Sequence, residues 1–244
     1  MMDKERDFRI MKMIEKHENW LKIKSMEGNY RKGDFSNMDL RGMNFRNVDL
    51  TEADFSMANL EGATFENVIF KNTNFNRAKL KGAIFIDVNF RASSLICADF
   101  SQSTLSTVNF CASALNNALF VGTKMENVFF NKTSLGDSDF SDSVLEYCIF
   151  DEATMEEVTF DKVSLTMCSA KRVNARGSSF VKGLLNYMDF KDSYLVNSIF
   201  NQCCLQHVSF VNADLKDSQK INVDLKHVAF SDESERREWF LSRC

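Results

Sequence analysis

Proline is absent from the 244 residues of this chain, and glycine is sparse at nine residues. Proteins average about 5% proline. Its absence favours a chain whose backbone N–H groups are mostly committed to sheet hydrogen bonds, because proline has no N–H to donate. The seven cysteines show no paired CxxC spacing, which argues against a zinc site and a disulfide framework. We therefore expect reduced thiols and no bound metal or other cofactor.

An excess of basic residues and a long apolar run are also missing. The net charge is -4, which argues against direct binding of nucleic acid, because neutralising phosphates requires clustered Lys and Arg. No apolar run approaches the roughly 20 residues that a membrane-spanning helix needs. The first ten residues, MMDKERDFRI, are charged where a signal peptide would be apolar. We expect a cytoplasmic protein without a membrane segment.

A five-residue repeat runs through most of the chain. From Phe35 to Phe230, every fifth residue is Leu, Phe or Met in 37 of 40 cases, without an insertion or deletion. A mostly small residue precedes each large one by two positions, as at Ala53, Ala58 and Ala63. This period fits neither an α-helix nor simple strand alternation, so it predicts a solenoid with short sides.

A second period gives the number of sides in each coil. Valine recurs every twenty residues at Val48, Val68, Val88, Val108 and Val128, and glycine does so at outward positions Gly42, Gly62 and Gly82. Four pentapeptides therefore close one coil. We predict an all-β fold, a right-handed quadrilateral parallel β-helix of about ten coils, near 48 Å long at a strand spacing of about 4.8 Å.

The large inward residues also predict how the walls of the coil differ. Phenylalanine occupies alternate large sites from Phe90 to Phe160, whereas the alternation is inverted before Leu60. We expect two opposite walls of stacked Phe and two of Leu. The lumen should adjust locally between Phe65 and Phe90.

The two ends of the chain do not follow the repeat. We predict a β-helix over residues 33–230, an N-terminal cap over 1–32 and a C-terminal cap over 231–244. Residues 3–24 predict an amphipathic helix whose apolar residues, Phe8, Met11, Ile14, Trp20 and Leu21, cover the first coil. Residues 232–242 start with an Asp-x-x-Glu capping pattern. Trp239, Phe240 and Leu241 then follow consecutively, so they point in different directions around a helix. We expect part of this apolar surface to form a homodimer contact.

Several pentapeptides are close copies of a known signature, A(D/N)LXX. They are ADFSM at 53–57, ANLEG at 58–62, ADFSQ at 98–102 and ADLKD at 213–217. Over roughly residues 33–230 the chain resembles the pentapeptide-repeat family. The resemblance implies a rod that binds a protein partner, with DNA gyrase or topoisomerase IV as the candidates, which loop-free members of the family bind by imitating DNA and protect from inhibitors. A protein-interaction scaffold or a host-directed effector module is the alternative that the family allows.

Three large sites depart from the repeat, namely Ala170, Ala175 and Lys220. Burying a lysine is costly, so we expect the coil near Lys220 to bulge or to turn its ammonium outward.

The sequence contains few candidate catalytic or metal-binding groups. It has no phosphate-binding loop, no HExxH and no dinucleotide fingerprint, so we expect no enzyme. His207 and His227 lie one coil apart, but no third metal ligand is evident. The same outward column contains Tyr147, Met167 and Tyr187, which is either a binding stripe or a self-stacking ladder. Cys148 and Cys168 are one coil apart at inward sites, and we expect buried thiols.

The most distinctive surface feature is a run of carboxylates without Lys or Arg over residues 137–161, which we call the acidic belt. Its nine members are Asp137, Asp139, Asp142, Glu146, Asp151, Glu152, Glu156, Glu157 and Asp161, all at outward positions. Basic residues follow from Lys162 onward, so the belt is either a self-compensating surface or a site for a basic cleft on a partner. We predict that the belt binds the partner.

Overall fold

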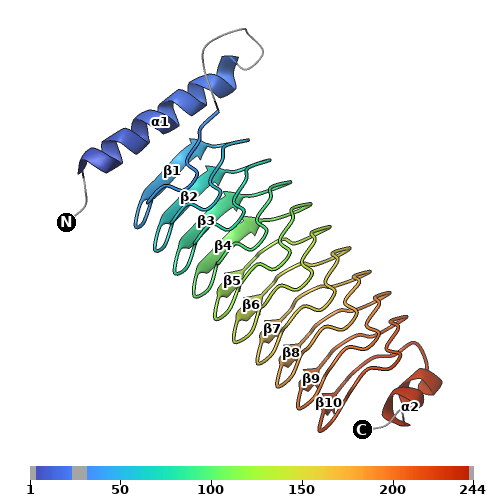
Figure 1. Cartoon of the computed structure of the whole chain (residues 1–244). Coiled ribbons are helices and arrows are strands. Elements are labelled where there is room, and N and C mark those ends of the chain that lie inside the picture. The colour runs from blue at the N-terminus through green and yellow to red at the C-terminus, as the bar shows by residue number, and fades with distance from the viewer. Residues whose placement is uncertain (1–3, 24–31, 242–244) are drawn as a thin grey trace.

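Ten parallel strands stack along the length of a rod, in the order in which they occur in the chain (Figure 1). The computed structural model describes residues 4–23 and 32–241. The strands are β1 (Asn44–Asp49), β2 (Thr64–Ile69), β3 (Ile84–Asn89), β4 (Thr104–Asn109), β5 (Lys124–Glu126), β6 (Val144–Glu146), β7 (Ser164–Thr166), β8 (Leu184–Asn186), β9 (Cys204–Gln206) and β10 (Asp224–Lys226). Helix α1 (Lys4–Ile23) lies at one end of the rod and α2 (Glu233–Leu241) at the other.

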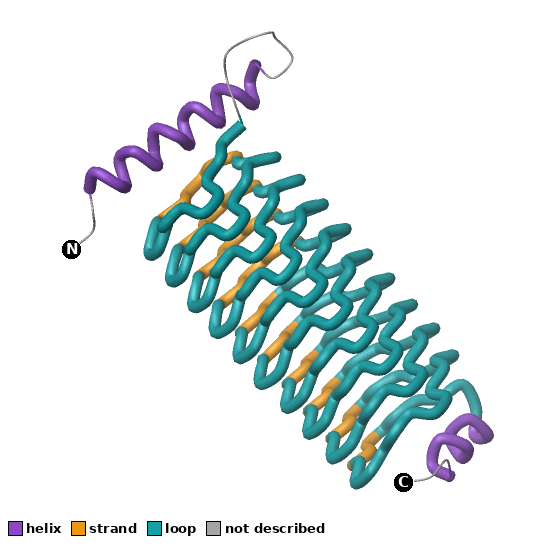
Figure 2. Tube along the Cα trace, viewed as in Figure 1, coloured by secondary structure: helices purple, strands orange, loops and turns teal. Residues whose placement is uncertain are grey.

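The coil contains twenty residues and four sides, as the sequence predicts. Paired residues in neighbouring coils differ by twenty, for example Phe45 with Phe65. Outside the strands, which Figure 2 shows in orange, the coils pair through single parallel bridges, such as Asp54 with Asn74 and Asn59 with Lys79. The right-handed parallel β-helix is therefore confirmed.

Each corner of the coil requires a left-handed backbone two residues after the large site. Gly42 adopts a φ of 66° there, and Asn47 and Glu52 adopt 53° and 66° at the same position in the next two pentapeptides. Glycine takes this conformation without strain. An Asp or Asn immediately before the large site supports the turn, because its side chain accepts a hydrogen bond from the amide two residues later. The Ser56 amide donates to Asp54 Oδ1 at 2.8 Å, which explains the D/N of the repeat signature.

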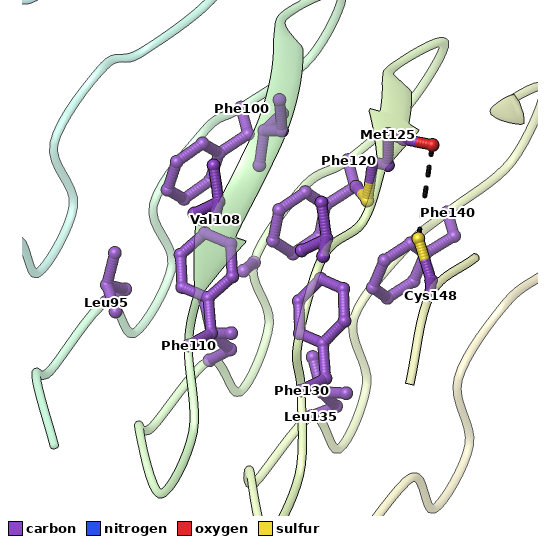
Figure 3. Packing of buried hydrophobic residues seen from close by; sticks show 14 of the residues in the cluster. Leu95, Phe100, Val108, Phe110, Phe120, Met125, Phe130, Leu135, Phe140 and Cys148 are labelled. Atoms are coloured by element: carbon purple, nitrogen blue, oxygen red, sulfur yellow. Dashed lines mark hydrogen bonds between the residues drawn. The ribbon is translucent and has the colours of Figure 1, made fainter. Parts of the chain in front are cut away.

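Stacked phenylalanine rings fill two opposite walls of the lumen at a time (Figure 3). Phe110 stacks on Phe90 at 5.0 Å and on Phe130 at 5.2 Å between ring centroids. The stacks change walls where the sequence alternation inverts, and the Phe70 ring there meets the edges of Phe65 and Phe75. The twenty-residue register continues through this region, so the adjustment is confined to side chains.

Helix α1 covers the first coil with a face that only partly matches the predicted one, since Ile14 is buried as expected. Ile10, Ile14 and His17 are buried, whereas Phe8 and Met11 are 66% and 50% exposed. The expectation for Phe8 and Met11 was therefore wrong. Ile10, Ile14 and His17 lie four and three residues apart, so they share one stripe of the helix. Apolar character alone could not choose between the two stripes.

Helix α2 closes the other end. The Ser234 amide donates to Asp232 Oδ1 at 2.8 Å, so Asp232 caps the start of the helix. Trp239 is 4% exposed and its ring lies against Phe230 at 5.5 Å and Phe210 at 5.9 Å. Its indole N–H donates to Ser218 Oγ at 3.0 Å.

The expectation that Lys220 turns outward was wrong, since this residue is only 8% exposed. Its Nζ lies 5.3 Å from the centroid of the Trp239 ring and donates to the Ser218 carbonyl at 3.5 Å. The electron-rich face of an indole attracts a desolvated cation. The cap therefore supplies a compensating group that the repeat pattern does not reveal.

Candidate functional site: an acidic belt and a tyrosine strip

The nine carboxylates of the acidic belt all point away from the lumen. Asp139, Asp151 and Asp161 are partly buried and the other six are exposed. Because a coil has twenty residues, a run from Asp137 to Asp161 passes over all four sides of the rod. The structure therefore distributes the belt around the rod and does not bring it together on one face.

Three belt residues hold the backbone of the rod. Asp139 Oδ1 accepts a hydrogen bond from the Ser141 amide at 2.8 Å within its own turn. Asp151 accepts from the Lys171 amide at 2.9 Å, and Asp161 accepts from the Val181 amide at 3.0 Å, so each ties its coil to the next one. These contacts give the three side chains a structural role.

Two further members are paired with cations one coil away. Glu152 lies 2.9 Å from the Arg172 guanidinium and 3.4 Å from Lys132 Nζ, and Asp142 lies 3.6 Å from Lys162 Nζ. The hydrogen bond from Arg172, together with Lys132, holds the pKa of Glu152 below its ordinary value. At these two positions the surface compensates its own charge.

The remaining members include three carboxylates on one edge of the rod, Asp137, Glu156 and Glu157, which we call the acidic corner. The Asp137 amide donates to the Glu156 carbonyl at 3.0 Å, so the two lie on neighbouring coils. The Glu157 carboxylate lies over Gly177, where an added Cβ would be 2.4 Å from its Oε1. Within the described residues, none of the three pairs with a Lys or Arg. Glu146, on another side, has no such pair there either.

The histidine column forms a stack of rings and not a chelating site. His207 lies 4.7 Å from His227 and 4.4 Å from Tyr187 between centroids, with interplanar angles of 12° and 4°. Parallel rings direct their nitrogens side by side, whereas a metal needs them to converge at about 2.0–2.1 Å. No group of three His, Cys, Asp or Glu side chains in the described part of the chain could hold a metal ion.

A strip without positive charge continues this column over β6 to β8 and includes part of an adjacent column, and we call it the tyrosine strip. Its members are Val144, Tyr147, Met167, Leu184 and Tyr187, which are 40–57% exposed. The outward side chains between them are Ser164, Thr166, Asn186 and Glu146, so Glu146 is the one charge. Depletion of charge with enrichment of Tyr and Met is typical of the core of a protein interface.

The sequence interpretation found Tyr147, Met167 and Tyr187 but missed Val144 and Leu184. These two belong to a second outward column on the same side, three residues before the first. Tracing every outward column at intervals of twenty would have found them.

The cysteines on the inner walls are free thiols. Cys148 and Cys168 are buried, and the Sγ of Cys168 donates to the Leu145 carbonyl at 3.5 Å. Burial raises the pKa of Cys203 to about 12. Reactive cysteines require a thiolate, so Cys203 is structural.

Trp239 is the one proposed dimerisation residue whose side chain the structure describes, and it packs on the last coils. The side chains of Phe240 and Leu241 lie outside the described residues, so dimerisation stays a prediction. Neither helix in the described residues is long and apolar enough to cross a membrane.

The repeat also matches a family model. Eight copies of the model described as pentapeptide repeats match residues 34–67, 73–110 and 138–177. This chain belongs to the pentapeptide-repeat family. Among curated protein sequences, none matches it significantly.

Solved structures similar to this pentapeptide-repeat protein include HetL from the cyanobacterium Nostoc sp. strain PCC 7120, described as involved in heterocyst differentiation regulation. It has 18% identity and a TM-score of 0.47, with 86% of this chain and 92% of HetL covered. QnrB1, a plasmid-mediated fluoroquinolone resistance protein, has 18% identity and a TM-score of 0.44 in a trypsin-treated form, with 86% and 95% covered.

Proposed function

We propose that this pentapeptide-repeat protein is a non-enzymatic rod that binds a protein partner through the acidic corner. The observation that carries the proposal is that Asp137, Glu156 and Glu157 are outward and have no cationic partner in the described part of the chain. Of the other belt residues, three support the backbone and two form ion pairs, and Glu146 lies apart on another side of the rod. A basic cleft on a partner would supply the missing cations.

DNA gyrase or topoisomerase IV is the candidate partner that the family suggests, with protection from inhibitors as the consequence. A duplex about 48 Å long would carry roughly 28 phosphate charges, at one per 1.7 Å. The whole chain has a net charge of only -4. DNA mimicry is therefore limited to the acidic corner, and we expect the partner to grip the middle of the rod in the cytoplasm.

The test uses purified DNA gyrase and topoisomerase IV with the full chain and with the charge-reversed triple variant Asp137→Lys, Glu156→Lys, Glu157→Lys. Exposed charge pairs contribute up to about 1 kcal/mol each, so three reversals should weaken binding on the order of 100-fold. Protection of quinolone-inhibited supercoiling should fall in parallel. The melting temperature should hardly change, because the three side chains are exposed and the hydrogen bond from Asn174 Nδ2 to Glu156 Oε1 at 2.8 Å lies on the surface.

A matched control places the same charge change elsewhere on the rod. Glu61, Glu126 and Asp217 are exposed and lie outside the acidic belt. The triple variant at these positions should bind as the unmodified chain does at moderate salt. Equal losses in both triple variants would indicate a nonspecific charge effect. Retention of binding by the acidic-corner variant would reject the corner, and lack of binding by the unmodified chain would reject both topoisomerases.

The second candidate function is a protein-interaction scaffold or a host-directed effector module, which the tyrosine strip favours. A partner that uses this strip should be insensitive to the acidic-corner variant. It should lose binding when Tyr147, Leu184 and Tyr187 are replaced by Ser. The two triple variants therefore separate the candidate functions for any partner that is found.

A further inference from the structure

His17 is the only polar side chain that α1 buries completely against the rod. It is 0% exposed and lies with Ile10 and Ile14 on the stripe that covers the first coil. Its Nδ1 accepts a hydrogen bond from the Gly33 amide at 2.8 Å. Since an accepting nitrogen carries no proton, this contact exists only with neutral imidazole.

The contact depends on a close approach between α1 and the start of the first coil. A Cβ added to Gly33 would lie 2.5 Å from the Phe35 ring and 3.3 Å from the His17 Cβ. No side chain fits between the helix and the coil at this point. His17 therefore rests directly on the backbone of residue 33.

The surroundings of His17 favour the neutral ring on balance. Burial lowers the pKa of His17, against the opposing effects of the Asp49 and Glu52 carboxylates and the Thr51 carbonyl on the first coil. On its own helix, the Trp20 ring lies 5.4 Å away between centroids. The Nε2 atom makes no hydrogen bond of ordinary geometry. A second proton would go to Nδ1 and break the bond to Gly33, and the burial of the ring outweighs the attraction of the nearby carboxylates for the cation.

We propose that α1 is a pH-controlled cover of the N-terminal end of the rod, docked while His17 is neutral and released when Nδ1 binds a proton. In the released state His17 has the ordinary pKa of about 6.5. Docking is unaffected by pH above this value. Below it, the docking equilibrium constant falls by about tenfold per pH unit until the lower pKa of the docked state is reached.

Release would expose the open edge of the β-ladder. Backbone groups of the first coil have no preceding coil to pair with, and α1 covers part of this edge. Arg6 Nη2 donates to the Arg41 carbonyl there at 3.3 Å. An uncovered edge is a template for another chain, so we expect acid-dependent end-to-end association of rods.

An ion pair between α1 and the first coil does not titrate in the same range. Arg6 Nη1 lies 3.9 Å from Asp39 Oδ1. The hydrogen bond from Arg41, with further help from the backbone and nearby charges, lowers the pKa of Asp39 to about 2. Asp39 therefore keeps its charge while His17 gains one.

The experiment is amide hydrogen exchange of the full chain read by mass spectrometry between about pH 7.5 and pH 5, with rates corrected for the intrinsic pH dependence. Below about pH 6.5, protection of peptides from α1 and of the Gly33 amide should fall by up to tenfold per pH unit. His17→Gln keeps a hydrogen-bond acceptor but cannot titrate here, so its protection should not vary. The double variant His207→Gln, His227→Gln should behave as the unmodified chain does.

A direct measurement covers the case in which His17→Gln fails to dock. The imidazole resonances of His17 in the unmodified chain should titrate with a midpoint below the ordinary value of about 6.5. An ordinary midpoint for His17, unchanged protection of α1 down to pH 5, or the same acid-induced loss in a docked His17→Gln variant would each overturn the proposal.

Discussion

Replacing Phe130 by alanine tests whether stacked rings hold the middle of the rod together. Phe130 is fully buried. It stacks on Phe110 at 5.2 Å and Phe150 at 4.8 Å, and it meets Phe120 and Phe140 edge-on at 5.9 and 5.8 Å. Removing the ring leaves a cavity and ends all four contacts.

The expected cost follows from these contacts. Phe→Ala in a core costs about 3–5 kcal/mol, and the loss of ring pairs worth about 0.5–1.5 kcal/mol each places Phe130→Ala near the upper end. Phe130→Leu should cost about 1–1.5 kcal/mol, because leucine fills equivalent inward sites on the other walls. Phe230→Ala should cost about 2 kcal/mol, since that ring is half-buried in the last coil.

Denaturant unfolding followed by far-ultraviolet circular dichroism measures the three costs. Each coil contacts only its neighbours, so a weak coil in the middle should also broaden the transition as the two halves of the rod unfold separately. A cost below about 1 kcal/mol for Phe130→Ala would refute the role of the stacks. Equal losses of unfolding free energy for Phe130→Ala and Phe230→Ala would show that the burial of a ring does not determine how much it stabilises the rod.

The remaining predictions concern surface and cap residues. At pH 8 a thiol reagent should modify exposed Cys97 rapidly and leave Cys203 unmodified in the folded chain, because the pKa of about 12 keeps that thiol protonated; rapid modification of Cys203 would contradict its burial. The exposed strip residues Leu184 and Tyr187 should tolerate serine within about 0.5 kcal/mol of unfolding free energy, and a larger loss would mean that the strip stabilises the fold. Light scattering of the intact chain should give a dimer mass that Phe240→Ser reduces to a monomer, whereas a monomer mass for the intact chain would reject the C-terminal contact.

At the two ends of the rod, the sequence predicted some features of the capping helices and not others. The cap at Asp232 could be predicted because a capping side chain acts on the amide two residues away. On α1 the burial of Ile14 was predicted, but the burial of Ile10 in place of Phe8 and Met11 could not be, because all three are apolar. The shape of the first coil and the Gly33 amide decide which stripe is buried.

The prediction that Lys220 turns outward was wrong for a similar reason. The cost of burying an ammonium is a sound general rule, but the compensating Trp239 ring comes from a helix outside the repeat. The two residues meet only once the last coil is closed.

By itself, the sequence determined the twenty-residue coil, the parallel register and the walls of stacked Phe. These features follow from inward side chains that recur at fixed intervals. The position of each pentapeptide in a coil can therefore be assigned from the sequence alone. The fate of each outward carboxylate was decided only by the tertiary structure. Glu152 and Glu156 each have an arginine twenty residues further along, Arg172 and Arg176, yet in the described part of the chain Glu152 forms an ion pair and Glu156 accepts a hydrogen bond from Asn174 instead. A run of acidic residues in the sequence does not reveal which side chains of the neighbouring coils will contact each carboxylate. Those contacts determine which carboxylates have a structural role and which are available to bind a partner.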